Sequence, residues 1–344
     1  MDRRRFIISS LATAGAGLAD ATMDLWSPAR AGTVSLAAFR KAFDRPRVPL
    51  EPQSVASEAK NGLVHEKVTV ASEAGVRVPL LIVRKPDAAG RLPAIVCLHG
   101  LGGSKEGMSG YLEEFARRGF VGVALDARYH GDRSGDLTKA MIASYRIGKE
   151  RPYLWDTVWD TWRALDYLQA RPDVDGKRLG VMGISLGGHT TWMVSADPRV
   201  KVAVPIISVC SWRWQLAHEG YKQRVANLQG AFDAVRNDLG EKTVTPKVVA
   251  AAWARWMPGI PDRFDCQDIL AAMAPRPLLI LGGDSDAVAP IEGAREAIAV
   301  IQAAYERARA ADRLQVVIAE HSGHAVTAAH EKAMYAWFDR WLKA

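Results

Sequence analysis

The chain has 344 residues, 49% of them hydrophobic, which is enough to bury a full core and excludes disordered and fibrous proteins. Its formal net charge of +7 is spread over the whole length, and no Lys/Arg block that could bind nucleic acid follows the extreme N-terminus. The three cysteines, Cys97, Cys210 and Cys266, form no disulfide scaffold and lack the CxxC spacing of zinc or redox sites. A disulfide between Cys210 and Cys266 stays open, since an oxidising compartment would permit it.

The first 31 residues have the order of an export signal. The arginines of Arg3-Arg4-Arg5-Phe6 precede a weakly apolar stretch at 7–19, and together they resemble a twin-arginine signal. The apolar stretch is too short to span a bilayer stably, and Ala29-Arg30-Ala31 offers a small-x-small cleavage site. We therefore expect removal of 1–31 and a periplasmic or secreted protein. The alternative is a disordered basic tail.

Eight short apolar or alternating runs predict β-strands in the rest of the chain. They lie at 64–71, 78–83, 94–98, 121–125, 179–182, 202–207, 277–281 and 314–318. The clearest helical patterns lie at 105–118, 156–170, 186–195, 292–310 and 325–342. This alternation predicts a mostly parallel sheet covered by helices on both faces, beginning with an antiparallel hairpin. We expect one domain, 32–344, interrupted by an insertion at 211–264.

The motif Gly183-Ile184-Ser185-Leu186-Gly187 matches G-x-S-x-G and stands between a predicted strand and a predicted helix. The glycines permit a tight turn that projects the serine hydroxyl, and the helix N-terminus favours the negative charge of the reaction. A glycine-rich turn without chemistry is the alternative. In this context, the motif predicts Ser185 as a nucleophile.

A serine nucleophile needs a base to remove its proton and a carboxylate to orient that base. The strand at 277–281 leads into a loop that carries Asp284 and Asp286. The last strand, at 314–318, leads into a loop that carries His321 and His324. Each loop therefore offers two candidates.

Around these loops the chain resembles the α/β-hydrolases, whose triad follows the chain order Ser, Asp or Glu, His. Their usual Gly-x-x-Asp-x-x-x-Pro pattern selects Asp286 and leaves Asp284 as a loop-capping residue. Their catalytic histidine follows a glycine, which selects His324 over His321. His321 and His324 have the HxxH spacing of some metal ligands, but they stand on a loop without a carboxylate partner. We therefore expect no metal and no cofactor.

The oxyanion of a tetrahedral intermediate needs two backbone N–H donors. The residue after the nucleophile, Leu186, supplies one. The second is expected from Leu101 in the loop His99-Gly100-Leu101-Gly102-Gly103, since the resemblance places the oxyanion residue directly after the His-Gly pair. The loop lacks the lysine and Ser/Thr of a Walker phosphate loop.

The segments 99–106 and 126–133 and the turn around Ser185 resemble the dienelactone-hydrolase and prolyl-oligopeptidase-like esterases. This resemblance runs from Val64 to the C-terminus, apart from the insertion. It implies the α/β-hydrolase fold, with a mostly parallel eight-stranded sheet flanked by helices. Dienelactone hydrolases proper use a cysteine nucleophile, whereas this chain has Ser185. We expect 126–133 to brace the structure only.

These features favour a serine carboxylesterase or deacylase that cleaves a small to medium ester through an acyl-enzyme on Ser185. An aminopeptidase or acylaminoacyl peptidase is the alternative, because such peptidases share this core, although they usually add a large propeller domain. A non-catalytic binding module would normally lack a triad member. The expected partner is a small-molecule ester, with no nucleic acid and no stable membrane span.

The insertion is rich in large apolar side chains. They are Trp212, Trp214, Tyr221, Trp253, Trp256 and Met257. They either pack insertion helices onto the core or form a lid over Ser185. The lid is favoured, because a segment leaving the carboxyl end of a strand starts beside the crevice where α/β proteins bind ligands. Trp212, Trp214 and Trp256 are then candidates for substrate contact.

Overall fold

A computed structural model describes residues 35–87, 90–133, 135–147 and 153–343. The expected export signal, 1–31, lies outside the described residues. No helix among those described is long and apolar enough to cross a membrane.

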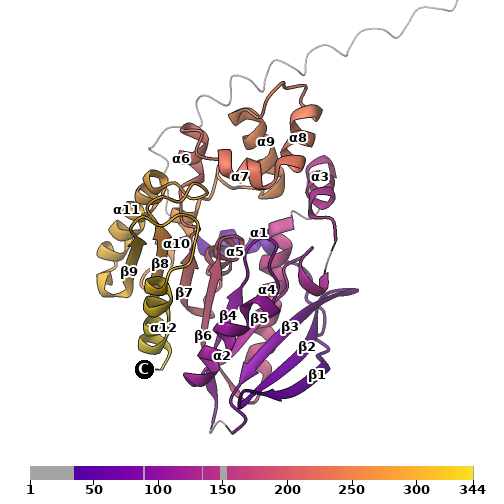
Figure 1. The fold of residues 1–344 in the computed structure, drawn as a ribbon, viewed down its shortest axis with the longest axis vertical. Helices are drawn as coiled ribbons and strands as arrows, with labels where there is room; N and C mark the ends of the chain where they lie inside the picture. Colours follow the sequence, from indigo (N-terminus) through magenta and orange to yellow (C-terminus); the bar gives the residue numbers. More distant parts are fainter. Residues whose placement is uncertain (1–34, 88–89, 134, 148–152, 344) are drawn as a thin grey trace, which may run out of the picture. The chain divides into compact units, whose positions relative to one another are not determined.

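Nine strands of the described residues form one sheet in the order β1-β2-β3-β5-β4-β6-β7-β8-β9 (Figure 1). The strands are β1 (Gln53–Lys60), β2 (Leu63–Glu73), β3 (Val76–Arg84), β4 (Leu92–Leu98), β5 (Val121–Leu125), β6 (Val174–Ile184), β7 (Val200–Ile206), β8 (Leu278–Gly283) and β9 (Leu314–Ala319). The pairs along β1-β2-β3-β5 are antiparallel, and the pairs from β5 to β9 are parallel. The eight predicted strands and the opening hairpin are therefore confirmed.

The predicted number of strands is wrong by one, because β1 forms an additional edge strand. All eight of its residues are exposed, so its sequence carries no apolar alternation that would indicate a strand. It joins the sheet through its pairing with β2 alone.

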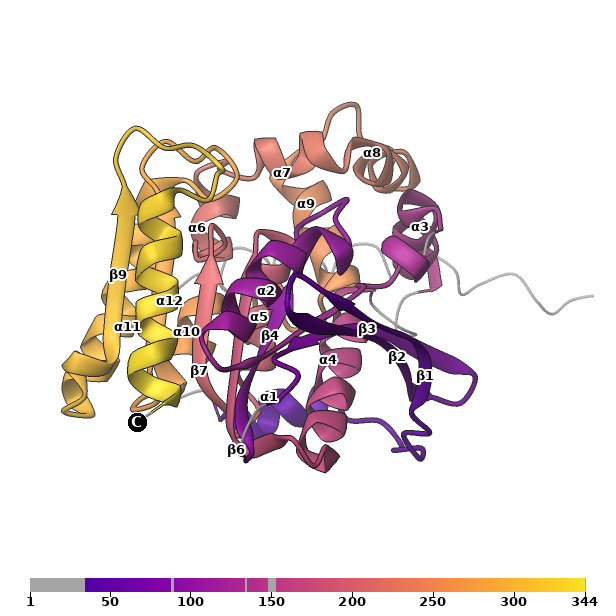
Figure 2. The same ribbon diagram turned by 60° about the horizontal axis from the view of Figure 1, so that its bottom comes forward.

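Helices cover both faces of this sheet (Figure 2). The helices outside the insertion are α1 (Leu36–Phe43), α2 (Ser109–Arg117), α3 (Leu137–Ile147), α4 (Tyr153–Ala170), α5 (Leu186–Val194), α10 (Cys266–Ala272), α11 (Ile291–Arg307) and α12 (Ala328–Leu342). Buried side chains of α2 and α12 form one core with one face of the sheet, and those of α1, α4, α5, α10 and α11 form the other. Strand β4 contributes Val96 to the second core and Cys97 to the first, as the alternation of a strand requires.

The insertion folds as four helices, which we call the lid: α6 (Trp212–Ala217), α7 (Lys222–Asn227), α8 (Gln229–Asp238) and α9 (Pro246–Trp256). Figures 1 and 2 both show the lid, with α3 beside it, at the end of the sheet where the parallel strands terminate.

Both ends of the lid are fixed at one buried carboxylate, Asp265. Its side chain accepts hydrogen bonds from the backbone N–H groups of Trp212 and Arg213 at the start of α6, at 3.2 and 3.0 Å. It also accepts one from Cys266 N–H at the start of α10, at 2.7 Å. The segment that holds the four lid helices therefore begins and ends next to the same side chain, that of Asp265.

All three cysteines are buried free thiols. The disulfide left open between Cys210 and Cys266 is not present in this structure. Burial raises the pKa of the Cys210 thiol to about 12, which keeps it protonated and unreactive.

Candidate active site

Ser185 stands in a sharp turn between β6 and α5, with a positive φ of 56°. The turn is crowded by backbone on both sides. A Cβ on Gly183 would lie 2.2 Å from the carbonyl oxygen of Gly187, and a Cβ on Gly187 would lie 2.1 Å from that of Leu98. Larger residues would clash here, so the glycines of the motif let the chain place the serine at the end of the sheet.

The loops after β8 and β9 bring a carboxylate and an imidazole to Ser185. His324 Nε2 lies 2.8 Å from Ser185 Oγ, and His324 Nδ1 lies 2.8 Å from Asp286 Oδ2. A carboxylate can only accept, so Nδ1 of His324 carries the proton and Nε2 of the neutral ring accepts from the serine hydroxyl. The three side chains thus form one chain of hydrogen bonds, in the grouping that the sequence predicts.

Asp286 is buried and its other oxygen is also bonded. Oδ1 accepts from the backbone N–H groups of Val288 and Ala289, at 2.8 and 3.0 Å. Burial pushes the pKa of Asp286 upward, but the hydrogen bonds from His324 and from the two N–H groups outweigh it and hold that pKa below its ordinary value. The carboxylate therefore stays ionised at neutral pH.

The competing residues of these loops lie apart from this chain of bonds. Asp284 accepts from Ser285 Oγ at 2.9 Å and from Ser322 N–H at 3.2 Å, which ties the two loops together. His321 is exposed and takes a positive φ of 52° in the turn after β9. Asp284 thus caps its loop, as predicted.

The loop after β4 passes directly over the serine. A Cβ on Gly100 would lie 3.8 Å from the Cβ of Ser185, and Leu101 and Leu186 line the same pocket as the serine. His99 fixes this loop, because its Nδ1 donates to Gly100 O at 2.8 Å and its Nε2 accepts from Ala127 N–H at 3.1 Å. Both residues expected to provide oxyanion donors are therefore next to Ser185.

The segment 126–133 braces the site from behind, as expected. Asp126 is buried and accepts from the backbone N–H and the ammonium of Lys105, at 2.7 and 2.8 Å, and from Asp132 N–H at 2.9 Å. Arg128 donates to Asp160 through two nitrogens, at 3.0 and 3.1 Å. These groups bond one another and do not line the pocket beside Ser185.

Two buried histidines make the stability of this region depend on pH. In His99 and His330 one ring nitrogen accepts a backbone N–H, so each ring must be neutral, and burial lowers the pKa of both. Below an unfolded-state pKa of about 6.5, the unfolded chain then binds more protons than the folded one. We expect the free energy of unfolding in urea to fall as the pH is lowered from 7.5 to 5.5. His330→Gln should make this pH dependence shallower, and an unchanged slope would contradict the assignment.

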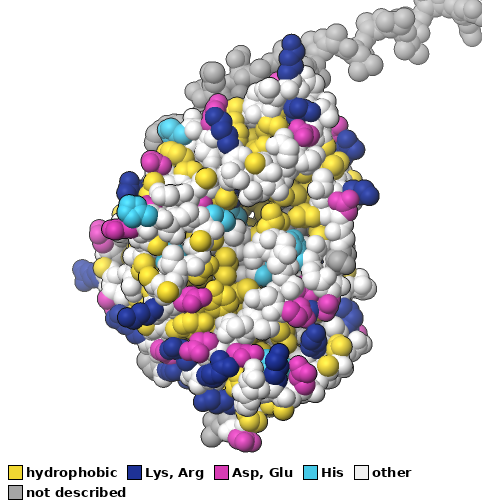
Figure 3. Space-filling view, viewed as in Figure 1, with side chains coloured by type: hydrophobic (Ala, Val, Ile, Leu, Met, Phe, Trp, Pro, Cys, Tyr) yellow, Lys and Arg dark blue, Asp and Glu magenta, His cyan; other side chains and the backbone are white. Residues whose placement is uncertain are grey.

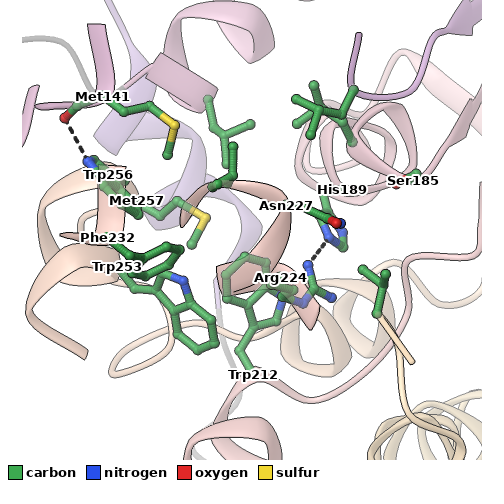
Figure 4. Close-up of a pocket in the computed structure, with 15 residues that line it drawn as sticks. Met141, Ser185, His189, Trp212, Arg224, Asn227, Phe232, Trp253, Trp256 and Met257 are labelled. Carbon is green, nitrogen blue, oxygen red and sulfur yellow. Dashed lines mark hydrogen bonds between the residues drawn. The ribbon is translucent and has the colours of Figure 1, made fainter. Parts of the chain in front are cut away.

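A pocket open to solvent, with about 710 Å³ of empty space, extends from Ser185 beneath the lid. Figure 3 shows hydrophobic side chains and histidines around the hollow between the lid and the sheet domain. Most of the insertion side chains that line the pocket are apolar (Figure 4), and five of them are Trp212, Phe232, Trp253, Trp256 and Met257. Residues of the insertion therefore form part of the wall of the pocket that contains Ser185.

Trp212 and Trp256 combine the two roles that the sequence left open, packing in the core and lining the pocket. Trp212 and Trp256 line the pocket but are only 3% and 2% exposed, and Trp256 Nε1 donates to Met141 O at 2.8 Å. Trp214 does not line the pocket; its ring stacks on His218 with centroids 4.6 Å apart. Residues two apart on a helix face different directions, so the structure does not support substrate contact by Trp214.

Three polar residues that the sequence analysis missed also line the pocket: His189, Arg224 and Asn227. His189 lies one helical turn after Ser185, and Arg224 reaches it from α7 (Figure 4). An arginine on a short polar helix resembles an ordinary solvent-exposed charge, so no sequence pattern indicates the position of Arg224. Among the described residues, no group of three His, Cys, Asp or Glu side chains is placed to hold a metal ion.

A nine-stranded, mostly parallel sheet with a serine elbow, and with Asp and His on the loops after its last two strands, defines a hydrolase of the α/β class. A model of the alpha/beta hydrolase family matches residues 95–337. The chain belongs to this family.

One relative by sequence and two solved structures are similar to this chain along most of its length. YtaP of Bacillus subtilis, which is named as a hydrolase, is 26% identical over 324 residues, which is 88% of this chain and 97% of that protein. Acetyl xylan esterase 1 from Thermoanaerobacterium superposes with a TM-score of 0.68 at 18% identity, covering 89% of this chain and 93% of its own. An acetyl xylan esterase from Paenibacillus gives a TM-score of 0.64 at 20% identity, with the same two coverages. At such identities the solved structures show a common fold.

Proposed function

We propose that this protein is a serine carboxylesterase. The observation that carries the proposal is the chain of hydrogen bonds from Ser185 through His324 to Asp286. The similar folds of two acetyl xylan esterases are consistent with the proposal.

The geometry supports an acyl-enzyme mechanism. His324 Nε2 takes the proton of the Ser185 hydroxyl as its oxygen attacks the ester carbonyl, and the ionised Asp286 stabilises the resulting imidazolium. The oxyanion accepts hydrogen bonds from the N–H groups of Leu101 and Leu186. His324 then protonates the departing alcohol, and the same ring activates the water that hydrolyses the acyl-enzyme.

The pocket favours small to medium esters with an apolar part. Most of the insertion side chains that line it are apolar, which suits a hydrocarbon part of the substrate. Labelling with a fluorophosphonate, followed by hydrolysis of p-nitrophenyl esters of rising chain length and of aminoacyl anilides, tests the proposal. Labelling with ester turnover is the expected result. Faster cleavage of anilides than of esters would favour the peptidase.

The depth of the pocket should set the preferred acyl length. Leu228 is half-buried between α7 and α8 and lines the pocket, so Leu228→Trp should fill it with little loss of stability. We expect kcat/KM for p-nitrophenyl octanoate to fall at least about tenfold relative to acetate, the order expected for space lost in an apolar site. Gln229→Trp, at the exposed neighbouring position, is the matched control. Equal losses on both esters would show that this part of the pocket does not hold substrate.

We further propose export through the twin-arginine route, with 32–344 as the mature domain. Support comes from the order of Arg3, Arg4 and the small-x-small site Ala29-Arg30-Ala31, all outside the described residues.

A further inference from the structure

A buried arginine that forms no ion pair with any described residue lines the pocket that contains Ser185. Arg224 is 8% exposed, and its hydrogen-bond partners are neutral: Nε donates to Gln215 Oε1 at 2.8 Å, and Nη1 donates to His189 Nε2. Among the described residues, no carboxylate forms an ion pair with it, and its Nη2 is buried without a hydrogen-bond partner. Burying a charge without an ion-pair partner is unfavourable, so this guanidinium is suited to bind an anion.

The neighbours of Arg224 hold it in place before any ligand arrives. The guanidinium carbon lies 4.6 Å above the ring of Trp212, a cation–π contact (Figure 4). Gln215, fully buried, is itself fixed by a bond from its Nε2 to Cys210 Sγ at 3.2 Å. A guanidinium fixed in this way loses little conformational freedom when it binds a ligand.

Three N–H donors of Arg224 are not used by its bonds to Gln215 and His189. A guanidinium has five N–H donors, and two are taken by Gln215 and His189. Since Gln215 occupies Nε, the remaining donors lie on the two terminal nitrogens, and the two oxygens of a carboxylate can accept from donors of this kind. His189 accepts from Arg224 and is therefore neutral; burial, Arg224 and His324 all lower its pKa.

We propose that Arg224 binds a free carboxylate of the substrate, so that the preferred substrates are esters with a carboxylate a short hydrocarbon spacer away from the scissile carbonyl. This inference rests on the proposed esterase function and deepens it. His189 follows Ser185 by one helical turn, which places its Arg224 partner near the nucleophile. The aromatic walls suit the spacer, and monoesters of dicarboxylic acids have this chemistry.

The test compares monomethyl glutarate, which is anionic, with its neutral counterpart, methyl pentanoate. The wild-type enzyme should favour the anionic ester in kcat/KM by at least about tenfold, and Arg224→Met should lose at least about tenfold of this ratio. Arg236→Met is the matched control, because this lid arginine donates to Asn237 and does not line the pocket; it should keep the wild-type ratio. A wild-type preference for the neutral ester, or equal losses on both esters in Arg224→Met, would overturn the proposal.

Binding measured without turnover separates this proposal from the esterase function. Calorimetry with Ser185→Ala should detect binding of glutarate, and Arg224→Lys in that background should weaken it at least about fivefold, because an ammonium lacks the planar fork. Glutarate binding that depends on Arg224 without any ester turnover would refute the esterase function alone. Ester turnover without glutarate binding would refute the carboxylate site alone. If Arg224→Met does not fold, Arg224→Lys is assayed for the ester ratio in its place.

Discussion

Replacing Ser185 by alanine should lower kcat for p-nitrophenyl acetate by about 10⁵- to 10⁶-fold, the loss expected when the nucleophile of a serine triad is removed. The variant has no hydroxyl for His324 Nε2 to deprotonate, so no acyl-enzyme can form. Fluorophosphonate labelling should disappear at the same time. Steady-state kinetics and labelling of the purified protein measure both effects.

Ser285→Ala is the control for this variant, since Ser285 is an exposed serine on the loop of Asp286 and its hydroxyl donates to Asp284. Its kcat should stay within a few fold of wild type. Wild-type turnover by Ser185→Ala, at an unchanged melting temperature, would mean that the reaction takes place elsewhere in the molecule.

Asp286→Asn should lower kcat by about 10⁴-fold, the effect measured for the equivalent change in a serine protease triad. An asparagine amide turned toward His324 would donate to Nδ1 where the carboxylate now accepts. The neutral ring would then carry its proton on Nε2 and could no longer accept from Ser185. Kinetics at pH 7.5 and above test this expectation.

Asp284→Asn provides the matched comparison, because it removes a carboxylate two residues away on the same loop. That carboxylate bonds Ser285 and the backbone of Ser322 and has no bond to His324. We expect activity within a few fold of wild type. A larger loss from Asp284→Asn than from Asp286→Asn would reverse the assignment of the two residues.

The sequence was informative wherever a local pattern decides the structure. The buried strands show as apolar runs, and the turn at Ser185 shows because only glycine fits where a Cβ on Gly183 or Gly187 would meet backbone at about 2 Å. The family resemblance then separated Asp286 from Asp284 and His324 from His321. Those choices agree with the hydrogen bonds of the structure.

The features that sequence analysis missed depend on contacts between distant residues. Strand β1 is exposed along its length, so only its pairing with β2 defines it. The environment of Arg224 is created by His189, which is 35 residues away, and by the packing of the lid on the sheet domain. No periodicity in the sequence indicates that a charged side chain on this short helix becomes buried in the fold.

The buried carboxylate of Asp265 holds the two ends of the lid together. Because the first turn of α6 and the first turn of α10 share one acceptor, the 50 or so residues between them form a loop whose ends meet. Such a loop can lengthen, shorten or be replaced while the strands that hold Ser185, Asp286 and His324 keep their register. Changes in the segment between Trp212 and Asp265 would therefore alter the wall of the pocket while leaving the residues of the chemical steps in place.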